Sequence, residues 1–146
     1  MSPIVRVATF DELDARTAYA AWQLRQQVFV VEQASPYPDL DGRDLEPTTR
    51  HLLIDEGDGL VGYLRLLDDG DARRIGRVVV APFARGRGLA DLLVRAALLE
   101  TGGRPVRLDA QVGLTAWYAG YGFVVTGPEF DEDGVRHVPM SRPAEP

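Results

Sequence analysis

The 146-residue chain contains neither cysteine nor lysine. Without cysteine it can form no disulfide bond or thiolate metal site and has no cysteine nucleophile, and we expect no metal site. Without lysine it has no lysine side chain to acylate. No run approaches the roughly 18 apolar residues of a membrane span, and residues 1–14 have no signal-peptide core. We therefore expect a soluble, cytoplasmic protein with a single domain over residues 1–146, its core at about 3–142 and a frayed tail at 143–146.

Charge is distributed unevenly along the chain, whose formal net charge is −6. Residues 61–107 carry a net charge of +4, whereas residues 1–60 carry −6 and residues 108–146 carry −4. The acidic total argues against nucleic-acid binding. The pattern favours a basic centre for a phosphorylated ligand beside acidic flanks that suit a cationic substrate.

Seven short apolar or alternating segments predict β-strands. Gly57-Asp58-Gly59 predicts a hairpin turn between the second and third strands, and the acidic segment Glu129–Gly134 joins the last two. Pro82 ends the fourth strand. The strands are predicted at Ile4–Ala8, His51–Asp55, Leu60–Leu67, Arg74–Val80, Val106–Ala110, Phe123–Thr126 and Val135–Arg142.

Three helices separate these strands. The first is predicted from the Thr9–Glu12 capping box to about Glu32, ahead of a polar loop at residues 33–49. The second begins at Leu89 and ends at Gly102-Gly103, and the third covers Leu114–Gly120. The order β-α-βββ-α-β-α-ββ predicts an α+β fold around a mixed sheet, with a right-handed crossover after the antiparallel meander.

Residues 78–90, VVVAPFARGRGLA, predict an anion site. They read as a strand, a turn rich in glycine and arginine, and the start of a helix. Such a turn directs several backbone N–H groups to one point, and the helix N-terminus adds positive potential. The segment is no Walker loop, because Gly-Lys-Ser/Thr is absent, and no Rossmann fingerprint, because the preceding strands are antiparallel. A phosphate or pyrophosphate is the expected ligand.

This segment resembles the acetyl-CoA motif of the GNAT family of N-acetyltransferases, in which Arg/Gln-x-x-Gly-x-Gly/Ala is matched by Arg85, Gly88 and Ala90. The aromatic segment Trp117–Phe123 is similar to a second mark of the family. Four further segments resemble its ElaA-like branch, and the resemblance covers residues 20–142. Those segments are residues 24–33, 37–42, 51–52 and 132–140.

The resemblance implies a GNAT-like acyl-CoA N-acyltransferase fold and an enzyme that transfers acetyl from acetyl-CoA to a primary amine of a small molecule or protein. It implies that the pantetheine arm lies along Val78–Val80 and that the turn takes the pyrophosphate. Tyr118 is then the candidate acid that protonates, or donates a hydrogen bond to, the departing thiolate. The implied cofactor-binding residues are Val78, Val79, Val80, Arg85, Gly86, Arg87, Gly88, Leu89 and Ala90.

The acceptor amine must react in its neutral form, so a base is needed. We expect Glu32 in that role, because it ends an apolar helical run where burial would raise its pKa. Asp41 and Glu132 are candidates to bind a cationic substrate, and Gln111 to line its cleft. His51 and His137, the two histidines of the chain, are further candidates for the substrate site.

Two other functions stay open from the sequence. A non-catalytic acyl-CoA sensor would bind the same cofactor without transferring its acyl group. A different nucleotide binder could use the same turn. The chain could be a monomer, or a homodimer joined through an exposed edge strand.

Overall fold

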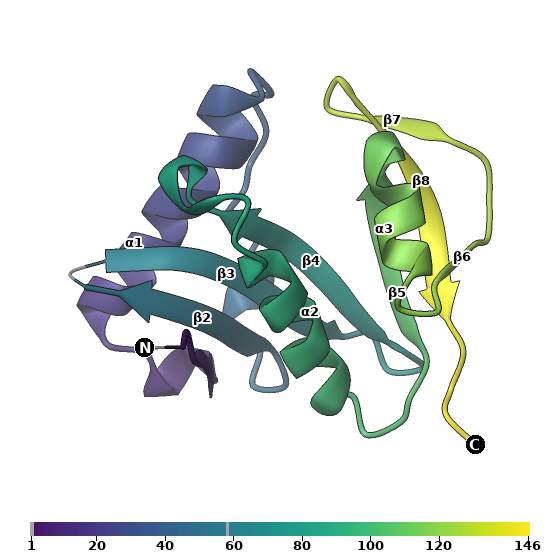
Figure 1. Ribbon diagram of the computed structural model, residues 1–146, viewed down its shortest axis with the longest axis horizontal. Helices are drawn as coiled ribbons and strands as arrows, with labels where there is room; N and C mark the ends of the chain where they lie inside the picture. The colour runs from purple at the N-terminus through teal and green to yellow at the C-terminus, as the bar shows by residue number, and fades with distance from the viewer. Residues whose placement is uncertain (1, 58) are drawn as a thin grey trace.

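The computed structural model describes residues 2–57 and 59–146, whose strands form one mixed sheet in the order β1-β2-β3-β4-β5-β8-β6, with β7 paired to β8 (Figure 1). Asp58, the middle residue of the predicted turn at 57–59, lies outside the described residues. The expected α+β fold and its order of main elements are confirmed. The strands are β1 (Val5–Ala8), β2 (Arg50–Glu56), β3 (Gly59–Asp68), β4 (Arg73–Val80), β5 (Val106–Gln111), β6 (Val124–Val125), β7 (Phe130–Glu132) and β8 (Val135–Arg142).

Two helices cover opposite faces of the N-terminal half of this sheet. A Cβ added at Gly62 of β3 would lie 3.3 Å from Leu93 of α2 (Leu89–Leu99). The next residue, Tyr63, instead lies against Arg25 of α1 (Ala15–Arg25). Successive side chains of a strand point to opposite faces, so α1 and α2 lie on different sides of β3. The apolar core fills both interfaces.

The first helix is divided into three parts rather than continuous from the capping box to Glu32. A short 3₁₀ turn, η1 (Phe10–Glu12), follows Thr9, whose backbone N–H donates to Glu12 at 2.8 Å. Asp14 then caps α1 by accepting from the Thr17 N–H at 2.7 Å. After Arg25 the chain continues as a π-helix, η2 (Gln26–Glu32). The prediction of a single helix was therefore wrong at both ends. Asp14 provides a second N-cap at which α1 begins, and the wider turns of the π-helix η2 follow its last residue.

Strands β4 and β5 are parallel neighbours only at one end. Arg73 and Arg74 pair with Val106 and Arg107, and no pairing continues along the described residues of β4 beyond them. A β-bulge adds to this divergence: Arg77, at φ +54°, and Val78 stand opposite the single residue Leu64 of β3. A bulge bends and twists its strand. The far half of β4 consequently presents an unpaired backbone edge toward β5.

The C-terminal half has one more strand than expected. The acidic turn predicted at 129–134 contains β7, which forms a hairpin with β8, and the strand predicted at 123–126 is reduced to β6. A five-residue helix, α3 (Thr115–Ala119), packs on β5. The chain end, expected to fray, is attached through the Glu145 N–H, which donates to the Gly103 carbonyl at 2.8 Å. Within the described residues, no helix has the length and apolar character needed to cross a membrane.

Candidate functional site

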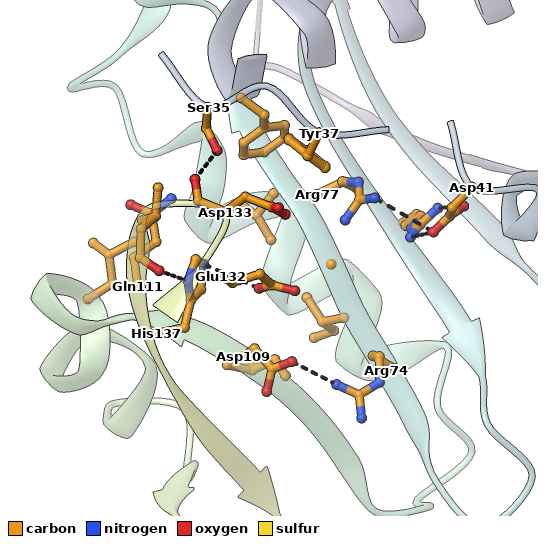
Figure 2. A pocket seen from close by; sticks show the side chains of 18 of the residues that line it. Ser35, Tyr37, Asp41, Arg74, Arg77, Asp109, Gln111, Glu132, Asp133 and His137 are labelled. Carbon is orange, nitrogen blue, oxygen red and sulfur yellow. Dashed lines mark hydrogen bonds and ion pairs between the residues drawn. The ribbon is translucent and has the colours of Figure 1, made fainter. Parts of the chain in front are cut away.

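A cavity of about 360 Å³ lies between the diverging strands. Its walls come from β3 and β4 on one side, and from β5, α3 and the β7–β8 hairpin on the other. Figure 2 shows polar side chains converging on it from both halves of the molecule. Of the substrate-site residues predicted from the sequence, the structure brings Asp41, Gln111, Glu132 and His137 together here, with Tyr118 at the same cavity.

The turn after β4 has the geometry of an anion cradle. Gly86 and Gly88 adopt φ angles of +80° and +77°, and a Cβ at either would meet no atom within 4 Å. Within the described residues, the backbone N–H groups of Gly86, Arg87 and Gly88 donate to no other group. The first N–H groups of the eleven-residue α2 follow directly and have no intrahelical acceptor. These free donors and the open space above them fit a pyrophosphate.

The unpaired edge of β4 continues from this cradle toward the cavity. Val78 lines the cavity, and Val80 immediately precedes the Ala81–Ala84 turn. The backbone of an extended amide-containing chain could pair with such an edge as an added half-strand. The residues present therefore fit both parts of coenzyme A, its pyrophosphate at the turn and its pantetheine arm along β4.

Both arginines of the turn form exposed ion pairs. Arg85 binds Glu32 through two contacts of 2.8 and 2.9 Å, and Arg87 binds Glu56. Water screens exposed pairs of this kind, so their net contribution is small and a more highly charged anion can replace the carboxylate. The two guanidinium groups are thus available to a pyrophosphate.

Glu32 does not have the environment that we expected of a base. Its side chain is 44% exposed and is not among the residues that line the cavity. The hydrogen bonds from Arg85 lower the pKa of Glu32, opposite to the predicted direction. The predicted rise was wrong because a partner 53 residues away supplies a positive charge where burial was expected.

Tyr118 has the environment expected of a weak acid in a dry site. Its side chain is 6% exposed and lies edge-on to Trp117 and Phe123, at ring-centroid distances of 4.9 and 6.0 Å. Burial raises the pKa of Tyr118 to about 12. Within the described residues its hydroxyl has no hydrogen-bond partner, so it is free to donate to a ligand in the cavity.

Carboxylates and amides of the C-terminal half form the opposite wall. Glu132 is half exposed, and its Oε2 lies 3.8 Å from His137 Nε2. Gln111 of β5 pairs in register with His137 of β8. Asp109 lies two residues earlier on β5 and approaches Arg74 at 3.5 Å across the cavity (Figure 2). This wall can accept hydrogen bonds from an ammonium or amine.

Asp41 lines the cavity, but its charge is compensated within the protein. Both of its oxygens accept from Arg65, at 2.6 and 2.8 Å. These hydrogen bonds hold the pKa of Asp41 far below its usual range. Arg65 also reaches Asp44, and Arg77 lies 2.8 Å from Asp39. Asp41 is therefore part of a charge network that fixes the loop at residues 33–49, rather than a free carboxylate.

His51 lies in the core and not at the cavity, so its predicted place in the substrate site was wrong. Its Nδ1 lies 2.6 Å from the Tyr63 hydroxyl and its Nε2 lies 3.0 Å from the Asp44 carbonyl oxygen. Trp22 of α1 covers the ring, and burial lowers the pKa of His51. His51 shares a face of the sheet with the cavity-lining Arg65, its register partner on β3, but Trp22 of α1 covers that face at β2.

Sequence reasoning missed a contact that joins the two halves over the cavity. The Ser35 hydroxyl donates to the Asp133 carbonyl oxygen at 2.5 Å, linking the loop that follows η2 to the β7–β8 turn (Figure 2). The sequence analysis also did not identify Arg65 and Arg77 as residues of this site. The signal for Arg65 was present, since it is a charged residue inside the otherwise apolar run of β3. No local signal distinguishes Ser35.

Comparison with known proteins gives consistent results. The family model described as "Acetyltransferase (GNAT) domain" matches residues 12–143. A UPF0039 protein of Mycobacterium tuberculosis is 49% identical over 98% of this chain and 95% of its own length. Protein ElaA of Escherichia coli is 41% identical over 90% of both chains, and its crystal structure superimposes with a TM-score of 0.90. An acyl-CoA N-acyltransferase from Pseudomonas aeruginosa has 39% identity and a TM-score of 0.91, covering 97% of this chain and 99% of its own.

Proposed function

The chain belongs to the GNAT acetyltransferase family, in its ElaA-like branch, and from this membership we propose that it transfers an acetyl group from acetyl-CoA to a primary amine. The observation that carries the proposal is the continuity of three features. A cradle of free N–H groups, an unpaired β4 edge and a cavity with a buried tyrosine follow one another along one side of β4. They match in order the pyrophosphate, the pantetheine arm and the reacting end of acetyl-CoA.

Each part of the site has a distinct task in this proposal. Residues 86–90 bind the pyrophosphate through backbone N–H groups, with Arg85 and Arg87 adding charge. The backbone of Val78–Val80 orients the pantetheine arm. When bound, acetyl-CoA supplies the activated acetyl group. Tyr118 donates a hydrogen bond at the position of the sulfur, and Gln111 and Glu132 bind the acceptor amine.

The proposal is tested by release of free thiol from acetyl-CoA in the presence of amines, polyamines, amino acids and peptides. Mass spectrometry of the acceptor then identifies the amide. Thiol release that depends on an amine supports the proposal. Tight binding of coenzyme A without transfer to any amine of the panel would instead support an acyl-CoA sensor.

We expect Arg85→Glu to weaken coenzyme A binding at least tenfold, because the variant removes a cation and places a carboxylate beside the pyrophosphate. Isothermal titration calorimetry with coenzyme A measures the effect. Arg95→Glu is the matched control: Arg95 is exposed on α2, pairs with Asp91 four residues away, and its replacement makes the same change in net charge outside the turn. Equal affinities for the two variants would contradict the cradle.

We expect Glu32→Gln to keep turnover within about twofold of the wild-type rate, because an exposed carboxylate paired with Arg85 is not positioned to accept the amine proton. The same variant frees Arg85 and should not weaken coenzyme A binding. Steady-state kinetics at saturating acetyl-CoA measure the turnover. A loss of 100-fold or more would restore Glu32 as the base.

A further inference from the structure

Three strands fix the position of His137. It pairs in register with Gln111 of β5 on one side and with Phe130 of β7 on the other. Its ring stacks on Phe130, with centroids 5.9 Å apart and planes inclined by 25°. The side chain is 14% exposed and lines the cavity. The ring is therefore held in one orientation at the edge of the cavity.

The hydrogen bonds of His137 also fix its tautomer. Nδ1 lies 2.8 Å from the Val135 carbonyl oxygen, which can only accept a hydrogen bond. Nδ1 therefore carries the hydrogen of the neutral ring, and Nε2 carries the lone pair. Nε2 is the atom that lies 3.8 Å from Glu132 Oε2 (Figure 2). A carboxylate thus faces the nitrogen that becomes positively charged on protonation.

We propose that His137 is the general base that takes a proton from the acceptor amine, an inference that rests on the function proposed above. An ordinary alkylamine has a pKa of about 10.4, so only about one molecule in several thousand is neutral at pH 7. A base at the site is therefore needed. Neutral imidazole with its lone pair directed into the cavity meets this need, and Glu132 stabilises the imidazolium that forms.

The arginines at the cavity and their carboxylate partners are less suited to this role. Arg65 and Arg77 of the facing wall lie in ion pairs with Asp41 and Asp39. Arg74 likewise lies in ion pairs, with Asp69 and with Asp109 of β5. Among the described residues that line the cavity, His137 is the one imidazole, and neighbouring strands hold its ring in place.

In this proposal each proton of the acceptor ammonium has a destination. His137 Nε2 takes one proton from the acceptor ammonium, which leaves a lone pair on the amine nitrogen. That lone pair forms the bond to the thioester carbonyl carbon, the carbon–sulfur bond breaks, and sulfur keeps the bonding electrons. The nitrogen loses its second proton as the amide forms, and this proton is the one that sulfur receives, by way of the Tyr118 hydroxyl. His137 returns its proton to water.

Nuclear magnetic resonance on the ligand-free protein tests the tautomer without any acceptor. The chain has two histidines, so ¹⁵N-histidine labelling gives two ring systems, assigned with the variant His137→Asn. We expect His137 to be protonated at Nδ1. We expect the opposite for the buried His51, whose Nε2 faces the Asp44 carbonyl oxygen. A neutral His137 protonated at Nε2 would overturn the proposal whatever the activity.

Kinetics test the role itself. The side-chain amide that His137→Asn introduces can still donate to the Val135 carbonyl oxygen, so the variant removes the base while keeping this hydrogen bond. We expect kcat at pH 7 to fall about 100-fold, with unchanged affinity for coenzyme A. The deficit should shrink as the pH approaches the pKa of the amine, because the free amine then needs no base. A merely structural loss would not be rescued by raising the pH.

Arg136→Asn is the matched control, since Arg136 is the exposed neighbour of His137 on β8. It should keep the wild-type rate and pH profile. An active wild-type protein with the same rate and profile in His137→Asn would overturn the base and leave the proposed function standing. A wild-type protein that acetylates no amine at any pH would overturn both.

Discussion

Replacing Tyr118 by phenylalanine is expected to lower kcat about 100-fold while leaving the affinity for coenzyme A unchanged. Tyr118 is buried and lines the cavity. In the proposed function its hydroxyl donates to the departing thiolate, so its loss removes the hydrogen bond that stabilises the developing charge. The ring itself is retained, so packing against Trp117 and Phe123 should persist.

The pKa of Tyr118 specifies what its hydroxyl contributes. With a pKa of about 12, it is a weaker acid than a thiol of pKa about 8.5 by about 3.5 units, or about 5 kcal/mol. Complete proton transfer to the thiolate is therefore uphill, and donation of a hydrogen bond dominates until another proton arrives. It follows that loss of the Tyr118 proton should not cause a fall in rate at any pH below about 12.

Stopped-flow or steady-state measurement of thiol release gives kcat, and calorimetry gives the affinity for coenzyme A. Tyr121→Phe is the matched control, because Tyr121 lies in the same segment, is not among the cavity-lining residues and donates its hydroxyl to Asp91 on α2. Its kcat should stay within about twofold of the wild-type value. Equal rates for Tyr118→Phe and Tyr121→Phe would remove Tyr118 from the mechanism.

The parts of the molecule that were predictable from the sequence are those whose causes are local. The turn at residues 85–90 is defined by glycines that need positive φ and by the helix that follows them. The stripe of Leu89, Leu93 and Ala97 on α2 is likewise a short-range pattern, and all three residues are buried. Strands β2 to β5 followed from alternation and turn residues, with ends correct to within one or two positions.

The parts that were missed depend on contacts between distant segments. Glu32 was assigned a raised pKa because its neighbours in sequence are apolar, yet Arg85, 53 residues away, lowers that pKa. Ser35 contacts Asp133, 98 residues away in the sequence, and no sequence pattern at either position predicts this contact. The bulge at Arg77 likewise depends on a contact between separate segments, because it arises where β4 pairs with Leu64 of β3. The bulge lies in the part of β4 that does not pair with β5, and both Arg77 and Val78 line the cavity.

Arg25→Met is expected to lower the free energy of unfolding by about 3–5 kcal/mol, although Arg25 does not line the cavity. The arginine is fully buried and donates to Asp39 and Asp44 at 2.9 and 2.7 Å. Burial alone lowers the pKa of Arg25, but the hydrogen bond with Asp44 and the nearby negative charges outweigh burial and raise it. Methionine fills a similar volume, so the main loss is the compensation of two buried carboxylates rather than packing.

For a domain of this size, such a loss corresponds to a fall of about 10 °C in Tm. Differential scanning calorimetry and urea unfolding measure it, with Arg95→Met as the surface control that should change stability by at most about 0.5 kcal/mol.

In the double variant Arg25→Met/Asp44→Asn, one of the two carboxylates is no longer charged. Part of the lost stability should therefore return. If Arg25→Met unfolds at the wild-type temperature, the free-energy cost of burying Arg25 with Asp39 and Asp44 already cancels the attraction between them. The loop at residues 33–49, which carries Tyr37 and Asp41 to the cavity, must then be fixed by its other contacts, among them those of Asp41 with Arg65 and of Ser35 with Asp133.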